Sequence, residues 1–112
     1  MSPTLILDGH NPDMVIGSGG SNRIRSAIVQ VILNYFCNNK SLGESIEAPR
    51  IHYETGSIFL EPGISLKNIA LPDETILHEF YEKSLFFGGV NAVTRKEAFS
   101  DKRRGGATAI ID

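Results

Sequence analysis

The sequence predicts a single α+β domain, residues 1–112, built on a mostly antiparallel sheet with helices packed on it. Two pairs of short apolar segments, each joined by turn-forming residues, predict two β-hairpins. A long apolar stripe with helical spacing predicts a half-buried helix between them. The length of 112 residues and the hydrophobic content of 41% fit one core that no linker divides.

The N-terminal segment predicts a hairpin followed by a glycine-rich loop. Leu5–Leu7 and Met14–Ile16 are short apolar runs, and an Asp-Gly pair within Asp8–Asp13 favours a turn between them. Three of the first four residues of Gly17–Asn22 are glycines, which adopt backbone conformations closed to other residues. We expect either a functional loop or a tight turn at this position.

The helix after this loop is expected to run from Arg23 to about Cys37. Ser21 or Asn22 is well placed to cap its N-terminus. The apolar positions that recur at helical spacing are Ile24, Ala27, Ile28, Val31, Ile32 and Tyr35. This stripe predicts one face of the helix buried against the sheet.

Two local signals follow the long helix. Ser41 and Glu44 fit the Ser-x-x-Glu capping box, which predicts a short helix that Pro49 must close. Arg50–Glu54 and Ser57–Glu61 are joined by a Thr-Gly pair and predict a second hairpin.

The C-terminal part is predicted to contain one more helix and two strands. The segment from Pro72 to Lys83 begins with residues that favour a first helical turn and has one apolar face, which predicts a helix. Leu85–Val93 predicts a buried strand containing a Gly-Gly pair, and Ala107–Ile111 predicts the last strand. Because Leu85–Val93 and Ile58–Leu60 carry few charges, an exposed edge there would favour pairing with another chain.

Composition argues against several classes of function. Lys and Arg number 11 and Asp and Glu 13, and a net charge of −2 argues against a general nucleic-acid binder. The longest apolar run, Ala27–Leu33, is interrupted by Gln30 and is too short to cross a membrane. A single cysteine provides neither an intrachain disulfide nor a Cys-rich zinc site. The N-terminus lacks the pattern of a secretory signal, and the compartment stays open.

The glycine-rich segment Gly17–Asn22 is the strongest candidate site. It lies between a predicted strand and a predicted helix, where free backbone N–H groups bind anions or developing negative charge. It lacks the last glycine of a dinucleotide fingerprint and the lysine of a Walker loop. Ser18 does not fit the nucleophile elbow of serine hydrolases. From the residues alone, a turn without a ligand is an equally good interpretation.

The other candidate residues favour structural roles. His10, His52 and His78 have no metal-ligand spacing, and we expect neither a metal site nor a cofactor. Cys37 ends an apolar helix and is expected to be a packed small hydrophobic residue. Lys102–Arg104 is expected to form a solvated basic turn.

Four segments, in order and at matching spacing, resemble the small subunit of the gamma-glutamyltranspeptidases (glutathione hydrolases), a family of N-terminal nucleophile hydrolases. The family has Ser-Ser-Met-Ser-Pro-Thr, Gly-Ser/Thr-Pro-Gly-Gly-Ser-Arg-Ile, Ala-Pro-Arg-x-His, and Asp-Pro-Arg followed by glycines. The matching segments here are Met1–Thr4, Gly17–Ile24, Ala48–His52 and Asp101–Gly106, with Lys102 in place of the last proline. The resemblance covers nearly the whole chain and implies the C-terminal part of a small subunit within an αββα sandwich.

The resemblance implies transfer of a gamma-glutamyl group from glutathione or a related amide to water or an amine. In the family, a threonine exposed by autocleavage is the nucleophile, while paired serines and an arginine of the other subunit hold the donor carboxylate. The threonine and the serines would precede Met1. We therefore expect the chain alone to be inactive, and to require the upstream segment and the large subunit or to self-associate. Family members are often periplasmic or extracellular.

Within the chain, the resemblance assigns a catalytic role to the glycine loop alone. By pattern, the backbone N–H groups of Gly19 and Gly20 form the oxyanion hole, and Ser18 lies with them in substrate binding. An ungapped match shifts the oxyanion pair to Gly20 and Ser21. Two alternatives are a non-catalytic binding module, whose loop holds a carboxylate or a phosphate, and a structural piece whose partner supplies missing strands.

Overall fold

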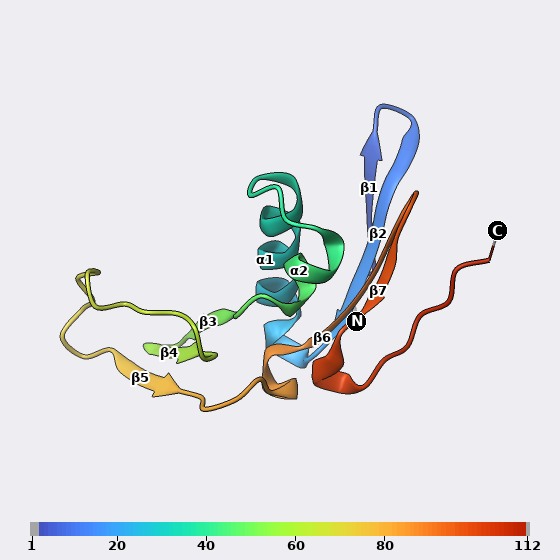
Figure 1. Ribbon diagram of the computed structural model, residues 1–112. Coiled ribbons are helices and arrows are strands. Elements are labelled where there is room, and N and C mark those ends of the chain that lie inside the picture. Colours follow the sequence, from blue (N-terminus) through green and yellow to red (C-terminus); the bar gives the residue numbers. More distant parts are fainter. Residues whose placement is uncertain (1–2, 112) are drawn as a thin grey trace.

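The computed structural model describes residues 3–111 and has the predicted α+β class (Figure 1). This range contains two α-helices and seven strands, and the strands form two sheets. The strands are β1 (Thr4–Asp8), β2 (Asn11–Gly19), β3 (Ile51–Glu54), β4 (Ser57–Leu60), β5 (Ile76–Glu79), β6 (Gly89–Thr94) and β7 (Ala98–Ser100). The helices are α1 (Ile24–Phe36) and α2 (Leu42–Glu47), with short 3₁₀ helices η1 (Ser21–Arg23), η2 (Leu85–Phe87) and η3 (Lys102–Arg104).

The larger sheet has the antiparallel order β1-β2-β6-β7. The predicted first hairpin is confirmed, and β2 continues beyond it to pair with β6. Both helices lie on one side of this sheet (Figure 1). The core between helices and sheet consists of Met14, Ile16, Ala27, Ile28, Val31, Leu42, Ile46, Val90 and Ala92. Alternation along the strands turns Val15 and Val93, which are directly paired, toward the opposite face, where they are 48% and 53% exposed.

Helix α1 confirms the predicted apolar stripe, because Ala27, Ile28 and Val31 are buried against the sheet. The predicted capping by Ser21 or Asn22 is wrong. Neither α1 nor the preceding η1 has a side-chain cap, and Ser21 has a φ of +55°. That conformation lies outside the β region that a capping residue normally uses.

Helix α2 confirms the predicted capping box. The Ser41 hydroxyl accepts the Glu44 N–H at 3.1 Å, and the Glu44 carboxylate accepts the Ser41 N–H at 3.2 Å. The helix ends at Glu47, two residues before Pro49, as the sequence predicts.

The smaller sheet confirms the second hairpin, β3–β4, and corrects the prediction of a helix from Pro72 to Lys83. Residues 76–79 form β5, an exposed strand parallel to β4. The Ile76 N–H donates to the Gly56 carbonyl at 3.0 Å, and the Phe80 N–H donates to the Leu60 carbonyl at 2.8 Å. Pairing with the preceding hairpin satisfies these backbone groups and overrides the local helix signals.

Two C-terminal predictions also need correction. The segment from Leu85 to Val93 is not one strand, because η2 and Gly88, with a φ of +89°, precede β6. The last strand is β7, and Ala107–Ile111 forms no regular element, although the Ser100 hydroxyl of β7 donates to the Ala107 carbonyl at 3.0 Å. Both β4 and β6 lie inside their sheets rather than at an edge.

None of the helices formed by residues 3–111 has the length and apolar character needed to span a membrane.

Candidate functional site

The glycine loop lies where β2 passes into α1, at one end of the larger sheet. Gly19 is the last residue of β2 and is paired with Gly89 of β6. Gly20 has a φ of +125°, and Ser21 follows with a φ of +55° before η1 leads into the helix. These two consecutive positive values bend the chain sharply between strand and helix.

Three consecutive backbone N–H groups at this bend are free. Among the described residues, none accepts a hydrogen bond from the N–H of Gly20, Ser21 or Asn22, whereas the Arg23 N–H donates to the Gly20 carbonyl at 3.0 Å. They precede a helix of 13 residues, whose N-terminus carries partial positive charge. The arrangement can therefore bind an anion or stabilise an oxygen that acquires negative charge.

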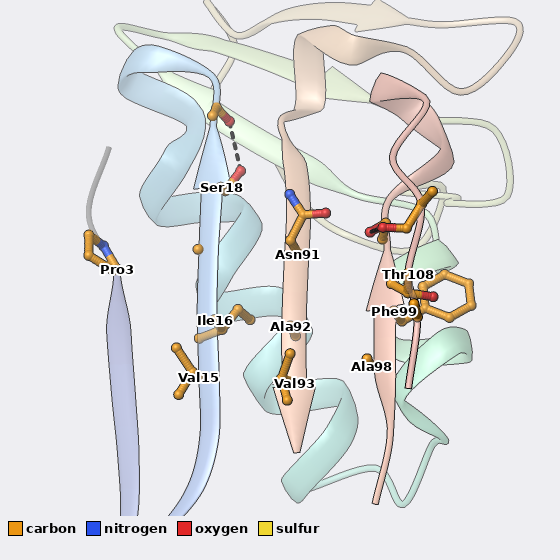
Figure 2. A pocket seen from close by; sticks show the side chains of 15 residues that line it. Pro3, Val15, Ile16, Ser18, Asn91, Ala92, Val93, Ala98, Phe99 and Thr108 are labelled. Carbon is orange, nitrogen blue, oxygen red and sulfur yellow. Dashed lines mark hydrogen bonds between the residues drawn. The ribbon is translucent and has the colours of Figure 1, made fainter. Parts of the chain in front are cut away.

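Ser18 supports the loop from the helix-covered face of the sheet. Its side chain is buried, its hydroxyl accepts the Gly89 N–H at 3.2 Å, and it donates to the Gly19 carbonyl at 2.7 Å (Figure 2). A Cβ on Gly88 would lie 2.8 Å from the Ser18 Oγ and 3.1 Å from the Gly19 carbonyl oxygen. Glycine at position 88 thus leaves the space that the hydroxyl occupies.

Two arginines flank the loop. The Arg104 side chain passes over Gly89, and a Cβ at position 89 would collide with the Arg104 Cδ. The Arg104 guanidinium lies against Gly19. This guanidinium donates to the Leu85 carbonyl at 3.2 Å. The Arg23 guanidinium donates to the Phe86 carbonyl at 2.8 Å and lies 4.3 Å from the centre of the Phe86 ring. Both cations add to the positive potential at the loop.

A pocket of about 560 Å³ runs along the uncovered face of the larger sheet, away from the helices (Figure 2). Its lining includes Val15, Gly17, Gly19, Asn91 and Val93. The glycine loop begins at the Gly19 end of this pocket.

A buried ionic network, which sequence reasoning missed, lies behind the loop. Arg50 pairs with Asp101 at 2.7 Å, and Arg103 pairs with Asp101 at 3.1 Å and with Glu61 at 2.5 Å. The prediction of a solvated basic turn at Lys102–Arg104 is therefore wrong for Arg103, whose side chain is 1% exposed. It is right for Lys102, whose side chain is 78% exposed.

The network holds the segment from Phe87 to Val90, on which the glycine loop packs. Arg50 donates to the carbonyls of Ile46 and Phe87, and Asp101 accepts the Val90 N–H at 3.0 Å. Burial alone would raise the pKa of Asp101, but the Arg50 guanidinium and the N–H groups of Val90 and Arg103 lower it below its usual value. Asp101 is therefore ionised at neutral pH.

Two of the three histidines lie on strands of the smaller sheet. His52 is buried on β3, where its Nδ1 lies 2.6 Å from the Ser26 hydroxyl, and burial lowers its pKa. His78 lies on β5 rather than on a helix and stacks on Phe59. No group of three His, Cys, Asp or Glu residues that could hold a metal ion occurs between residues 3 and 111. Cys37 is exposed, so the prediction that it is packed is wrong.

The structure brings the loop residues predicted from the sequence together. Gly19 belongs to the strand ladder, whereas no described residue accepts a hydrogen bond from the N–H of Gly20 or Ser21. Met1 and Ser2 of the first family-like segment lie outside the described residues.

Comparison with known sequences gives one consistent family. A sequence model of the gamma-glutamyltranspeptidases matches residues 1–111. Glutathione hydrolase proenzyme 1 of Schizosaccharomyces pombe is 31% identical over 88 residues, which are 79% of this chain and 12% of the relative. The glutathione hydrolase proenzyme of a Pseudomonas species is 35% identical over 54 residues, which are 48% of this chain and 9% of the relative. The chain thus spans about a tenth of the length of these relatives.

Solved structures show the same fold. The gamma-glutamyltranspeptidase of Pseudomonas nitroreducens complexed with L-DON matches all of this chain and 62% of its own, with 22% identity and a TM-score of 0.75. The transpeptidase CapD of Bacillus anthracis matches 99% of this chain and 70% of its own, with 23% identity and a TM-score of 0.73. The predicted fold class, part of the αββα sandwich of N-terminal nucleophile hydrolases, is confirmed.

Proposed function

Because the chain belongs to the gamma-glutamyltranspeptidase family, we propose that it is the C-terminal segment of a small subunit and supplies the oxyanion hole of the parent enzyme. The parent reaction is transfer of a gamma-glutamyl group, from glutathione or a related amide, to water or an amine. The observation that carries this proposal is the pair of consecutive free N–H groups on Gly20 and Ser21 at the N-terminus of α1.

The chemistry requires donors at this position. Attack of a nucleophile on the gamma-glutamyl carbonyl carbon moves an electron pair onto the carbonyl oxygen and forms a tetrahedral intermediate. Two N–H groups about 2.7–3.1 Å from that oxygen stabilise its charge more than they stabilise the neutral carbonyl. The positive end of α1 and the neighbouring guanidinium of Arg104 contribute in the same direction.

The remaining catalytic parts come from outside the chain in this proposal. The threonine nucleophile, with its own amine as base, and the groups that hold the donor carboxylate belong to the upstream segment and the large subunit. The uncovered face bearing Val15 and Val93 is available for the second sheet of the sandwich. The isolated chain should therefore hydrolyse no gamma-glutamyl anilide above background.

Backbone esters test the proposal in the assembled enzyme, meaning this chain together with the upstream segment and the large subunit of the same enzyme. An ester in place of the Gly19–Gly20 amide, or of the Gly20–Ser21 amide, deletes one N–H and keeps the side chains. Each ester should lower kcat by about 10² to 10³. An ester at the Ser21–Asn22 amide deletes the third free N–H, which lies outside the proposed pair, and should lower kcat by less than either of the first two esters.

Unchanged kcat with either of the first two esters would exclude that N–H from the oxyanion hole. A loss confined to an ester at the Ser18–Gly19 amide would instead support Gly19 as a donor. If none of the esters changed kcat and the loop bound free glutarate or phosphate, the non-catalytic binding module would be the better account.

A further inference from the structure

The Ser18 hydroxyl has a donor and an acceptor role that are both fixed inside the protein. It accepts the Gly89 N–H at 3.2 Å, so its own proton is directed to the Gly19 carbonyl oxygen at 2.7 Å (Figure 2). The side chain is 3% exposed, on the same face of β2 as the core residues Met14 and Ile16. The hydroxyl therefore holds the Gly19 carbonyl toward the helix-covered side of the sheet.

The same contact determines where the Gly20 N–H points. The Gly19 carbonyl and the Gly20 N–H belong to one planar trans amide, so the two groups point in opposite directions. Fixing the carbonyl toward Ser18 turns the Gly20 N–H away from the Ser18 hydroxyl, and no described residue accepts a hydrogen bond from this N–H.

This amide needs an external restraint. It connects two glycines, Gly19 and Gly20, and glycine dihedral angles rotate with the lowest steric cost. A flip of the amide would replace the N–H with a carbonyl dipole at the reacting oxygen. The next amide is restrained separately, since the Arg23 N–H donates to the Gly20 carbonyl at 3.0 Å. Within residues 3–111, Ser18 is the one side chain that donates to the Gly19 carbonyl.

We propose that Ser18 is a positioning residue, whose hydroxyl orients the Gly19–Gly20 amide so that the Gly20 N–H faces the developing oxyanion. This inference rests on the proposed function of the loop. Ser18 acts through the backbone and contacts no reacting atom. Gly88 is part of the same device, because a Cβ at that position would displace the hydroxyl.

The test compares three variants of the assembled enzyme. Ser18→Ala removes the hydroxyl and leaves the backbone of β2 able to pair. Ser18→Thr keeps the hydroxyl on a residue that strands accommodate well. Ser45→Ala is the matched control, because Ser45 is also buried and its hydroxyl donates to the Ser41 carbonyl at 2.7 Å in α2, outside the glycine loop.

We expect Ser18→Ala to lower kcat by about 10-fold to 100-fold with little change in KM, since misplacing a transition-state donor spares ground-state binding. Ser18→Thr should retain activity. Ser45→Ala should lower the urea midpoint by a similar amount and leave kcat unchanged. In addition, Ser18→Ala combined with the ester at the Gly19–Gly20 amide should be no slower than the ester alone, because both changes act on the same N–H.

Three outcomes would overturn the inference. If the Gly19–Gly20 ester lowers kcat and Ser18→Ala does not, the proposed function stands and the positioning role of Ser18 is wrong. If the two changes multiply, Ser18 acts through some other group. If the ester itself has no effect, the proposed function fails at Gly20 and the inference fails with it.

Discussion

Arg50 and Asp101 form an ion pair of 2.7 Å in which both side chains are almost completely buried. Arg50 immediately precedes β3, and Asp101 immediately follows β7, so the pair connects the smaller sheet to the larger one. Asp101 also accepts the Val90 N–H, and Arg50 donates to the Phe87 carbonyl. The pair thus fixes both ends of the segment that contains Gly88 and Gly89, against which the glycine loop packs.

Removing Asp101 should be strongly destabilising. Asp101→Ala leaves the buried Arg50 guanidinium without its partner, and we expect a loss of about 3–5 kcal/mol in the free energy of unfolding. Urea denaturation of the variant and of the unsubstituted chain measures this loss. The control is Lys102→Ala, which removes an exposed ion pair to Glu47 and should cost less than about 1 kcal/mol. Equal effects of the two substitutions would contradict the structural role of the network.

The apolar stripe of α1 gives a second prediction. Ile28→Ala should lower the free energy of unfolding by about 2–5 kcal/mol, because Ile28 is buried between α1 and the sheet. Val29 is the next residue and is 53% exposed, so Val29→Ala should change stability by less than about 0.5 kcal/mol. A denaturation midpoint that is insensitive to Ile28→Ala would show that this face is not buried in solution.

Stability should depend on pH through His52. Burial lowers the pKa of His52 below the usual value of about 6.5, with smaller effects of the opposite sign from Glu54 and of the same sign from Arg23 and Arg25. Between the two pKa values the unfolded chain binds more protons than the folded chain, so stability rises with pH and reaches its full value above about 6.5. Urea midpoints from pH 5 to 7.5 should show this rise. The rise should be smaller in His52→Gln, and an identical pH profile in that variant would contradict the assignment.

The uncovered face of the larger sheet predicts self-association of the isolated chain. Val15 and Val93 lie side by side on this face, and Leu5 and Leu7 of β1 are also more than half exposed. Sedimentation at micromolar concentration should detect oligomers that dissociate on dilution. The double variant Val15→Thr with Val93→Thr preserves strand propensity and should weaken this association. A compact monomer at every concentration would favour a free-standing module over a segment of a larger enzyme.

Signals carried by neighbouring residues were sufficient to predict the local elements. The capping box of Ser41 and Glu44 depends on residues three apart, and the α1 stripe on residues three or four apart. The strand β5 could not be predicted in this way, because its conformation is set by pairing with β4, about 20 residues earlier in the chain.

The candidate site also combines features set by neighbouring residues with features set by residues far apart in the sequence. The glycines and their place between strand and helix were enough to locate the loop. The burial of Arg103 depends on Glu61, 42 residues away, and the Ser18 hydroxyl depends on Gly89, 71 residues away. Such contacts leave no local pattern in the sequence. The sequence therefore could not choose between Gly19–Gly20 and Gly20–Ser21 as the proposed oxyanion pair. That choice depends on where β2 ends, because Gly19 belongs to the strand ladder and Gly20 does not.

A crystal structure of the assembled enzyme with a glutamine analogue bound as a tetrahedral adduct tests the central claim most directly. The proposal predicts the adduct oxygen about 2.7–3.1 Å from both the Gly20 and Ser21 nitrogens, a distance at which backbone donors stabilise an oxyanion. The Ser18 hydroxyl should remain on the Gly19 carbonyl in the same structure. An adduct oxygen held by other donors, with Gly20 and Ser21 beyond hydrogen-bonding distance, would contradict the assignment of the oxyanion hole to this loop.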